Sequence, residues 1–124
     1  MKKRSTTSDI TSVLSMFLPK GLLSYFDIVF HSETDTCYLL YLEEKNNIPE
    51  ELSLLSLHSK GFFPEIQVQD FPIRGKAVFL NIKRRRWEDP STGKTYSRDW
   101  QLVASGTRIT AEFGSFLKEL LRSQ

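Results

Sequence analysis

Residues 69–87 read QDFPIRGKAVFLNIKRRRW, a turn followed by an apolar strand that ends in four consecutive cations and a tryptophan. Pro72 suits the second position of a turn because its ring presets φ, and Gly75 can adopt the positive φ that closes a short hairpin loop. Apolar residues then recur with the period of two that places them on one face of a strand: Val78, Leu80 and Ile82. The sequence therefore predicts a hairpin whose second strand leads from the core into a basic segment.

The basic segment 83–86 is the strongest chemical signal in the chain. Continuing the period of two places Arg84 and Arg86 on the core-facing side and Lys83, Arg85 and Trp87 on the opposite side. Four adjacent positive charges repel one another, and an anionic partner, most commonly phosphate, keeps them close. A solvated strand end is the competing interpretation.

Length and composition indicate one soluble globular domain: 124 residues, of which 40% are hydrophobic and 26% charged. No apolar run approaches the roughly 20 residues that a bilayer crossing needs, so we expect no membrane insertion. Residues 1–4 are basic, but the stretch behind them is polar and contains no signal-cleavage site. We expect a disordered basic leader at 1–8, a single domain at 9–124 and a cytoplasmic location.

Cysteine and histidine usage disfavours a metal site. Cys37 is the single cysteine, so it forms neither an internal disulfide nor a multi-thiolate site, and His31 and His58 stand apart in the sequence. We therefore expect no metal and no cofactor.

The net charge of +2 divides unevenly along the chain. Residues 33–73 carry eight acidic and two basic side chains, and residues 74–108 carry nine basic and three acidic ones. A domain divided in this way can turn a basic face toward a polyanion, or its acidic part toward a basic partner.

Local patterns predict an α+β fold, in which a small antiparallel β-meander of hairpins is bracketed by an N-terminal and a C-terminal helix. Ser8 or Asp9 caps a helix that ends at Pro19, and Thr110 caps a helix with Phe113, Phe116, Leu117, Leu120 and Leu121 on one face. Strands are predicted at 25–30, 36–42, 65–71, 76–87 and 94–100, and Pro49 begins a short helix.

One enzymatic pattern is present. Asp27 near one strand start and Glu43-x-Lys45 at the next strand end imitate nucleases in which carboxylates hold Mg²⁺ and a lysine polarises the phosphate. Acids at strand ends are common, so the pattern is more simply structural, and we expect no enzyme.

Short motifs carry a family resemblance: LEEKN (42–46) followed by IP (48–49), HSKGFF (58–63), QDFPIRGK (69–76), KRRRW (83–87) and SRDW (97–100). Together they resemble the N-terminal region protein of a bacterial insertion-sequence transposase family over residues 9–122. Residues 58–113 are more distantly similar to the zinc-ribbon segment that precedes the DDE catalytic domain in larger transposases. Where those relatives place cysteines, this chain has EDPSTGK (88–94), so no zinc ligand set carries over.

The resemblance implies a DNA-recognition subunit that binds the double-stranded terminal inverted repeats of a mobile element during transposition, a form of DNA recombination. The DDE catalytic subunit lies on another chain or reading frame, and the oligomeric state is left open. Phosphate contacts are expected from Lys83, Arg84, Arg85 and Arg86, flanked by Arg74, Lys76, Lys94, Arg98 and Arg108. Trp87 either stacks on a base or packs as a half-buried hairpin residue against Tyr96 or Trp100. The alternatives are a docking module for the catalytic subunit that binds no DNA itself, and a small Mg-dependent nuclease.

Overall fold

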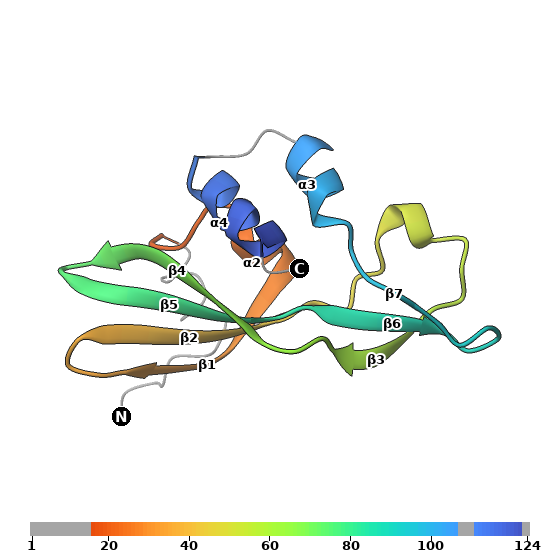
Figure 1. Ribbon diagram of the computed structural model, residues 1–124, viewed down its shortest axis with the longest axis horizontal. Helices are drawn as coiled ribbons and strands as arrows, with labels where there is room; N and C mark the ends of the chain where they lie inside the picture. Colours follow the sequence, from red (N-terminus) through yellow and green to blue (C-terminus); the bar gives the residue numbers. More distant parts are fainter. Residues whose placement is uncertain (1–15, 107–110, 123–124) are drawn as a thin grey trace, which may run out of the picture.

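The computed structural model describes residues 16–106 and 111–122 (Figure 1). Its helices are α2 (Leu22–Tyr25), α3 (Trp100–Gly106) and α4 (Ala111–Arg122), with a 3-10 turn η1 (Glu50–Leu52). Its strands are β1 (Phe26–Glu33), β2 (Cys37–Glu44), β3 (His58–Phe62), β4 (Ile66–Ile73), β5 (Lys76–Lys83), β6 (Arg85–Asp89) and β7 (Lys94–Tyr96). The predicted α+β class is confirmed.

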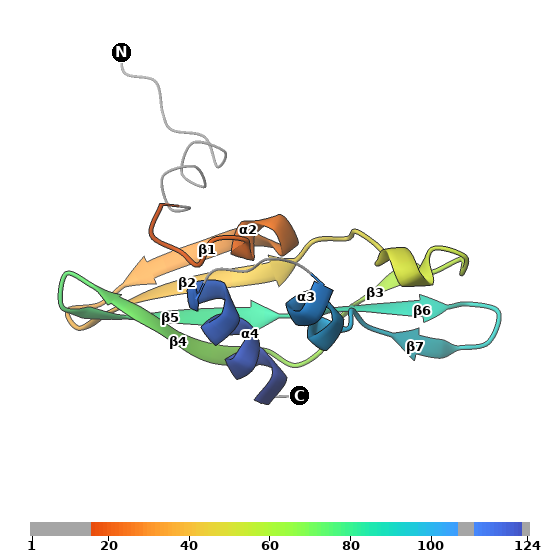
Figure 2. The ribbon, with the colours of Figure 1, turned by 90° about the horizontal axis from the view of Figure 1, so that it is seen from above.

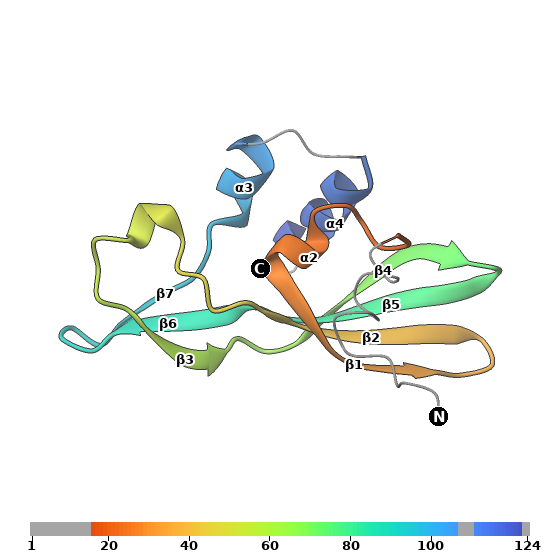
Figure 3. The ribbon, with the colours of Figure 1, turned by 180° about the vertical axis from the view of Figure 1, so that it is seen from behind.

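The strands form two sheets, one in the order β1-β2-β5-β4 and one in the order β3-β6-β7. The predicted hairpins β1–β2, β4–β5 and β6–β7 are all antiparallel. At the centre of the larger sheet, however, β2 and β5 run parallel, a pairing that the predicted meander did not contain. β5 and β6 lie end to end, so one extended stretch of chain runs through both sheets (Figures 1 and 3).

The turn between β4 and β5 differs from the prediction in one position. Arg74 and Gly75 have φ values of 51° and 81°, which is the left-handed pair that a two-residue hairpin loop requires. Gly75 therefore takes its predicted role, whereas Pro72 lies inside β4 rather than in the turn. β4 is an edge strand, and its register is irregular between Asp70 and Ile73, so the missing N–H of Pro72 is accommodated there.

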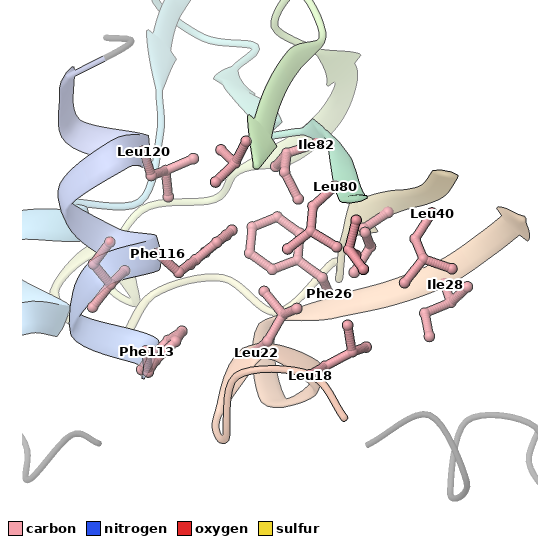
Figure 4. Close-up of a cluster of buried hydrophobic side chains, with 14 of the residues drawn as sticks. Leu18, Leu22, Phe26, Ile28, Leu40, Leu80, Ile82, Phe113, Phe116 and Leu120 are labelled. Carbon is pink, nitrogen blue, oxygen red and sulfur yellow. The ribbon is translucent and has the colours of Figure 1, made fainter. Parts of the chain in front are cut away.

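The main core lies between the larger sheet and the helices. Val78, Leu80 and Ile82 are fully buried on the predicted face, and α4 buries its predicted stripe of Phe113, Phe116, Leu117 and Leu120 against them (Figure 4). α2, α3 and α4 all lie on the same side of the sheet (Figures 1 and 2). The other side carries no described helix or strand.

Two local predictions can be compared with the structure at Pro49 and Trp100. Pro49 precedes η1, as expected. Trp100 was predicted to end a strand but begins α3, because the Asp99 carboxylate accepts hydrogen bonds from the N–H groups of Gln101 and Leu102 and so caps a helix. Most of the predicted N-terminal helix, the 1–8 leader and the cap at Thr110 lie outside the described residues. Among the described helices, none is long and apolar enough to cross a membrane.

Candidate nucleic-acid interface

The strand alternation reverses at Arg84, which belongs to neither β5 nor β6. Because this residue is inserted between the two strands, Arg85 and Trp87 return to the side of the core, and Lys83 and Arg86 point away from it. Trp87 is completely buried, pairs with Tyr96 across the β6–β7 hairpin, and donates from Nε1 to Asn46 Oδ1 at 2.9 Å. The predicted faces of Arg85, Arg86 and Trp87 are therefore wrong, whereas Lys83 points away from the core as predicted. Trp87 packs against the predicted neighbour Tyr96, more deeply than expected.

A buried carboxylate, Glu44, lies at the junction of the two sheets. It ends β2 in phase with Leu40 and Leu42, which places it on the core side. Its Oε2 accepts a 2.7 Å hydrogen bond from Arg98 Nε, and its Oε1 accepts one from the Arg85 backbone N–H at 2.9 Å. Burial raises the pKa of Glu44 above its ordinary value, while the hydrogen bonds from Arg98 and Arg85 act in the opposite direction.

Arg98 is the main counter-charge of Glu44. Its side chain is only 11% exposed, and its Nη2 also donates to the Asn47 carbonyl at 2.6 Å. Its guanidinium lies over three rings, at 5.1 Å from Tyr25, 5.9 Å from Trp87 and 5.7 Å from Trp100. This arginine holds the two sheets and α3 together and does not present a free cation to a phosphate.

Arg85 has a similar structural role. Its Nε donates to the Glu44 carbonyl at 3.0 Å, its Nη1 donates to Ser59 Oγ at 2.5 Å, and its guanidinium lies 4.7 Å from the Phe62 ring centre. Arg85, a predicted phosphate contact, and Arg98, a predicted flanking cation, therefore both bind groups in the interior of the fold.

Four other cations lie close together where β5 passes into β6: Lys60, Lys83, Arg84 and Arg86. We call them the junction patch. Arg86 is exposed and donates from Nε and Nη2 to the Lys60 carbonyl at 3.2 and 3.0 Å, which fixes its guanidinium beside β3. Lys60 is exposed, with its Nζ 3.7 Å from Glu88 Oε1. Arg84 is half-buried over the Phe63 ring, and burial lowers its pKa. Lys60 had no signal in the sequence, because only the β3–β6 pairing brings it to this position.

The flanking cations do not join this patch. Arg74 and Lys76 lie at the β4–β5 turn, and the seven steps of β5 from Lys76 to Lys83 span about 23 Å. Lys76 also binds Glu33 Oε2 at 2.6 Å and lies over the Tyr38 ring. Lys94 lies near the β6–β7 turn, at the opposite end of the molecule from the β4–β5 turn (Figure 1). Arg108 lies outside the described residues.

The residues of the nuclease-like pattern do come together. Asp27 and Glu43 are direct partners in the β1–β2 register, and Lys45 Nζ lies 3.8 Å from Asp27 Oδ1. Glu44, between Glu43 and Lys45, is the buried partner of Arg98. No group of three or more histidine, cysteine or acidic side chains that could hold a metal ion occurs within residues 16–106 and 111–122.

Comparison with known proteins gives one partial likeness. The chain is 32% identical over 100 residues to a molybdenum cofactor sulfurase of Emericella nidulans. The matched region covers 74% of this chain but only 12% of the sulfurase. No protein-family model and no solved structure matches the chain.

Besides Lys60, sequence reasoning missed Glu44, although a signal for Glu44 was available. Leu40, Leu42 and Glu44 share one strand phase, so an acid continues a buried row, and such an acid requires a buried cation. Arg98 lies between aromatic residues at 96 and 100, which marks it as the candidate partner.

Proposed function

We propose that this chain is the DNA-binding N-terminal region of a bacterial insertion-sequence transposase. It is not itself an enzyme, acts in the cytoplasm, and works with a DDE catalytic subunit on a separate chain or reading frame. The observation that supports DNA binding is the junction patch, in which four cations remain near one another after the structural arginines are set aside. Phosphate oxygens are the partners that such a patch fits best.

The position of the patch also supports this proposal. It lies where β5 passes into β6, and Lys83 and Arg86 point away from the helices. Lys83, Arg84 and Arg86 are among the contacts predicted from the sequence, and Lys60 takes the place of Arg85. The preferred site is the terminal inverted repeat of the element.

Binding to duplex DNA should depend on salt with a slope of log affinity against log salt of about −3 to −4, since about four phosphates are neutralised. Replacing Lys60 and Arg86 together by alanine should remove about two units of that slope, with little loss of stability because both side chains are exposed. Labelled terminal and scrambled duplexes, titrated at several salt concentrations, provide the measurement.

Lys118→Ala is the matched control, because Lys118 is an exposed cation on α4, on the helical side of the sheet. It should leave the slope unchanged. Wild-type protein without salt-dependent affinity for either duplex would refute the proposal, as would a Lys60→Ala/Arg86→Ala variant that binds like wild type.

A docking module for the catalytic subunit is the second candidate, and one surface favours it. The connection from β2 to β3 exposes Ile48 and all of the Leu54 side chain, beside the exposed acids Glu50 and Glu51 of η1. An apolar and acidic surface of this kind suits a basic partner. If the DNA titrations fail, binding of the catalytic subunit that is lost in Leu54→Glu is the result that would establish this alternative.

The nuclease is the third candidate, because Asp27, Glu43 and Lys45 adjoin on one surface. We expect Mg²⁺ or Mn²⁺ to leave plasmid and linear DNA intact in the presence of the purified protein, since the exposed Asp27, the half-buried Glu43 and a lysine form an ordinary surface network. Gel electrophoresis after prolonged incubation tests this expectation. Metal-dependent cleavage that disappears in Glu43→Ala would contradict it.

A further inference from the structure

The side of the larger sheet that faces away from α2, α3 and α4 is called here the open face. Every second side chain of the two central strands points away from the core and lies on the open face. These are Cys37, Leu39, Tyr41 and Glu43 of β2, and Ala77, Phe79, Asn81 and Lys83 of β5. Leu39, Tyr41 and Phe79 are only half-buried there. The open face therefore has an apolar and aromatic centre.

A β-bulge adds a further aromatic ring to the open face. Ile28 pairs with Leu42 on the core side, but the register shifts at Val29, and Phe30 then pairs with Tyr41. Phe30 is turned outward, is 61% exposed, and packs its ring 5.5 Å from that of Tyr41. Without the bulge this phenylalanine would point into the core.

Charges of both signs lie at one end of this apolar centre. Glu43 of β2 and Lys83 of β5 are direct register partners, and both line a hollow of about 200 Å³ together with Phe30 and Tyr41. Asp27 lies beside Glu43 on β1. These carboxylates disfavour a polyanion on the open face, so the stacking of nucleic-acid bases on its aromatic rings is not the best use of it.

We propose that the open face binds a second copy of this chain, forming a symmetric dimer whose two-fold axis runs parallel to the strands, between β2 and β5. Such an axis places β2 of one copy over β5 of the other. Because β2 and β5 are parallel, each β2 residue then faces its own register partner from the second copy. Sheets that pack face to face keep their strands within about 30° of one another, which this arrangement satisfies.

The arrangement matches the chemistry of three of the four facing pairs, and the fourth places Tyr41 over the buried Asn81 of the second copy. Leu39 faces Phe79 of the second copy, and Cys37 faces Ala77, so apolar side chains meet apolar side chains. Glu43 faces Lys83 of the second copy, and the symmetry repeats this ion pair. In the dimer Lys83 is therefore taken up by this pair, and Lys60, Arg84 and Arg86 are the cations of the junction patch that remain for phosphate. A partner with charge of one sign would leave Glu43 or Lys83 opposed by a like charge, so a self-complementary partner fits better.

The size of the open face also suits a stable dimer. Four strands of eight residues each cover about 19 by 26 Å, or about 500 Å² before side-chain relief is counted. Side chains that project from the surface bring the accessible area toward the roughly 800 Å² per partner of a standard interface.

Charge exchange at Glu43 and Lys83 tests the proposal by sedimentation equilibrium. Wild-type protein should dimerise, and Lys83→Glu or Glu43→Lys should each weaken the dimer by at least about tenfold, because each places like charges opposite one another twice. The double variant Glu43→Lys/Lys83→Glu restores both pairs and should return to within about threefold of wild type. Thermal melts confirm that each variant is folded.

Lys118→Glu is the matched control, since Lys118 is an exposed cation on α4, on the helical side of the sheet; it should leave the dimer unchanged. Wild-type protein that stays monomeric at 100-micromolar concentration, about a hundredfold above a micromolar Kd, would overturn the proposal. So would a double variant no better than the single ones, or a monomer that binds single-stranded DNA through Phe30 and Tyr41. Because the readout is mass, its failure is distinct from failure of the duplex titrations.

Discussion

Arg98→Ala should lower the free energy of unfolding by about 3–5 kcal/mol, because it leaves the Glu44 carboxylate buried without its main counter-charge. The variant also loses the hydrogen bond to Asn47 and the contacts with Tyr25, Trp87 and Trp100. Denaturant unfolding followed by circular dichroism measures the change. Arg86→Ala, which removes an exposed arginine from the neighbouring strand, is the control and should change stability by at most about 0.5 kcal/mol.

The pH dependence of Arg98→Ala separates lost charge compensation from lost packing. Arg98 lowers the pKa of Glu44, so its removal raises that pKa further above the value in the unfolded chain. A carboxyl whose pKa is higher in the folded state stabilises the fold most below its unfolded pKa of about 4.3, and this contribution is lost as the pH rises through the folded pKa. The deficit of the variant should therefore be smaller near pH 4 than near pH 7. A deficit that does not change with pH would show that packing alone is responsible.

Trp87→Ala should lower the free energy of unfolding by about 3–5 kcal/mol, since a completely buried indole is removed from between the smaller sheet and the β2–β3 connection. Trp87→Phe keeps a buried ring and loses the Nε1 hydrogen bond to Asn46, so it should cost about 1 kcal/mol for that bond. Chemical denaturation measures both variants.

The phenylalanine variant also tests the base-stacking hypothesis for Trp87. Because the ring is buried, Trp87→Phe should keep the duplex affinity of wild type, measured at concentrations where both proteins are folded. A stable Trp87→Phe protein with weakened duplex binding would contradict the structural role assigned here.

The hairpins, the buried row of β5 and the apolar face of α4 could be predicted because each is encoded in local periodicity. Turn residues and alternation determine strands that pair with their neighbours in sequence. The parallel pairing of β2 with β5 could not be predicted in this way, because β3 and β4 lie between these two strands in the sequence.

The candidate site was harder to predict, because single inserted residues decide which way its side chains point. A bulge at Val29 turns Phe30 outward, and Arg84 turns Arg85 and Trp87 inward. Neither residue differs in type from an ordinary strand residue, so periodicity alone assigned the wrong faces to Arg85, Arg86 and Trp87. The hydrogen bonds of Arg85 and Arg98 to Glu44 could not be predicted either, because more than 40 positions of sequence separate each arginine from Glu44.

The parallel contact between β2 and β5 has a consequence for the order of folding. Each antiparallel hairpin can form from neighbouring residues within microseconds, but the larger sheet closes only when β2 meets β5 across the intervening residues 45–75. Closing so long a loop costs entropy before any contact is gained. The pairing of β2 with β5, rather than the formation of a turn, is therefore expected to limit the folding rate. Until they pair, β2 and β5 each expose an unpaired strand edge, and the nascent chain is most vulnerable to aggregation at that stage.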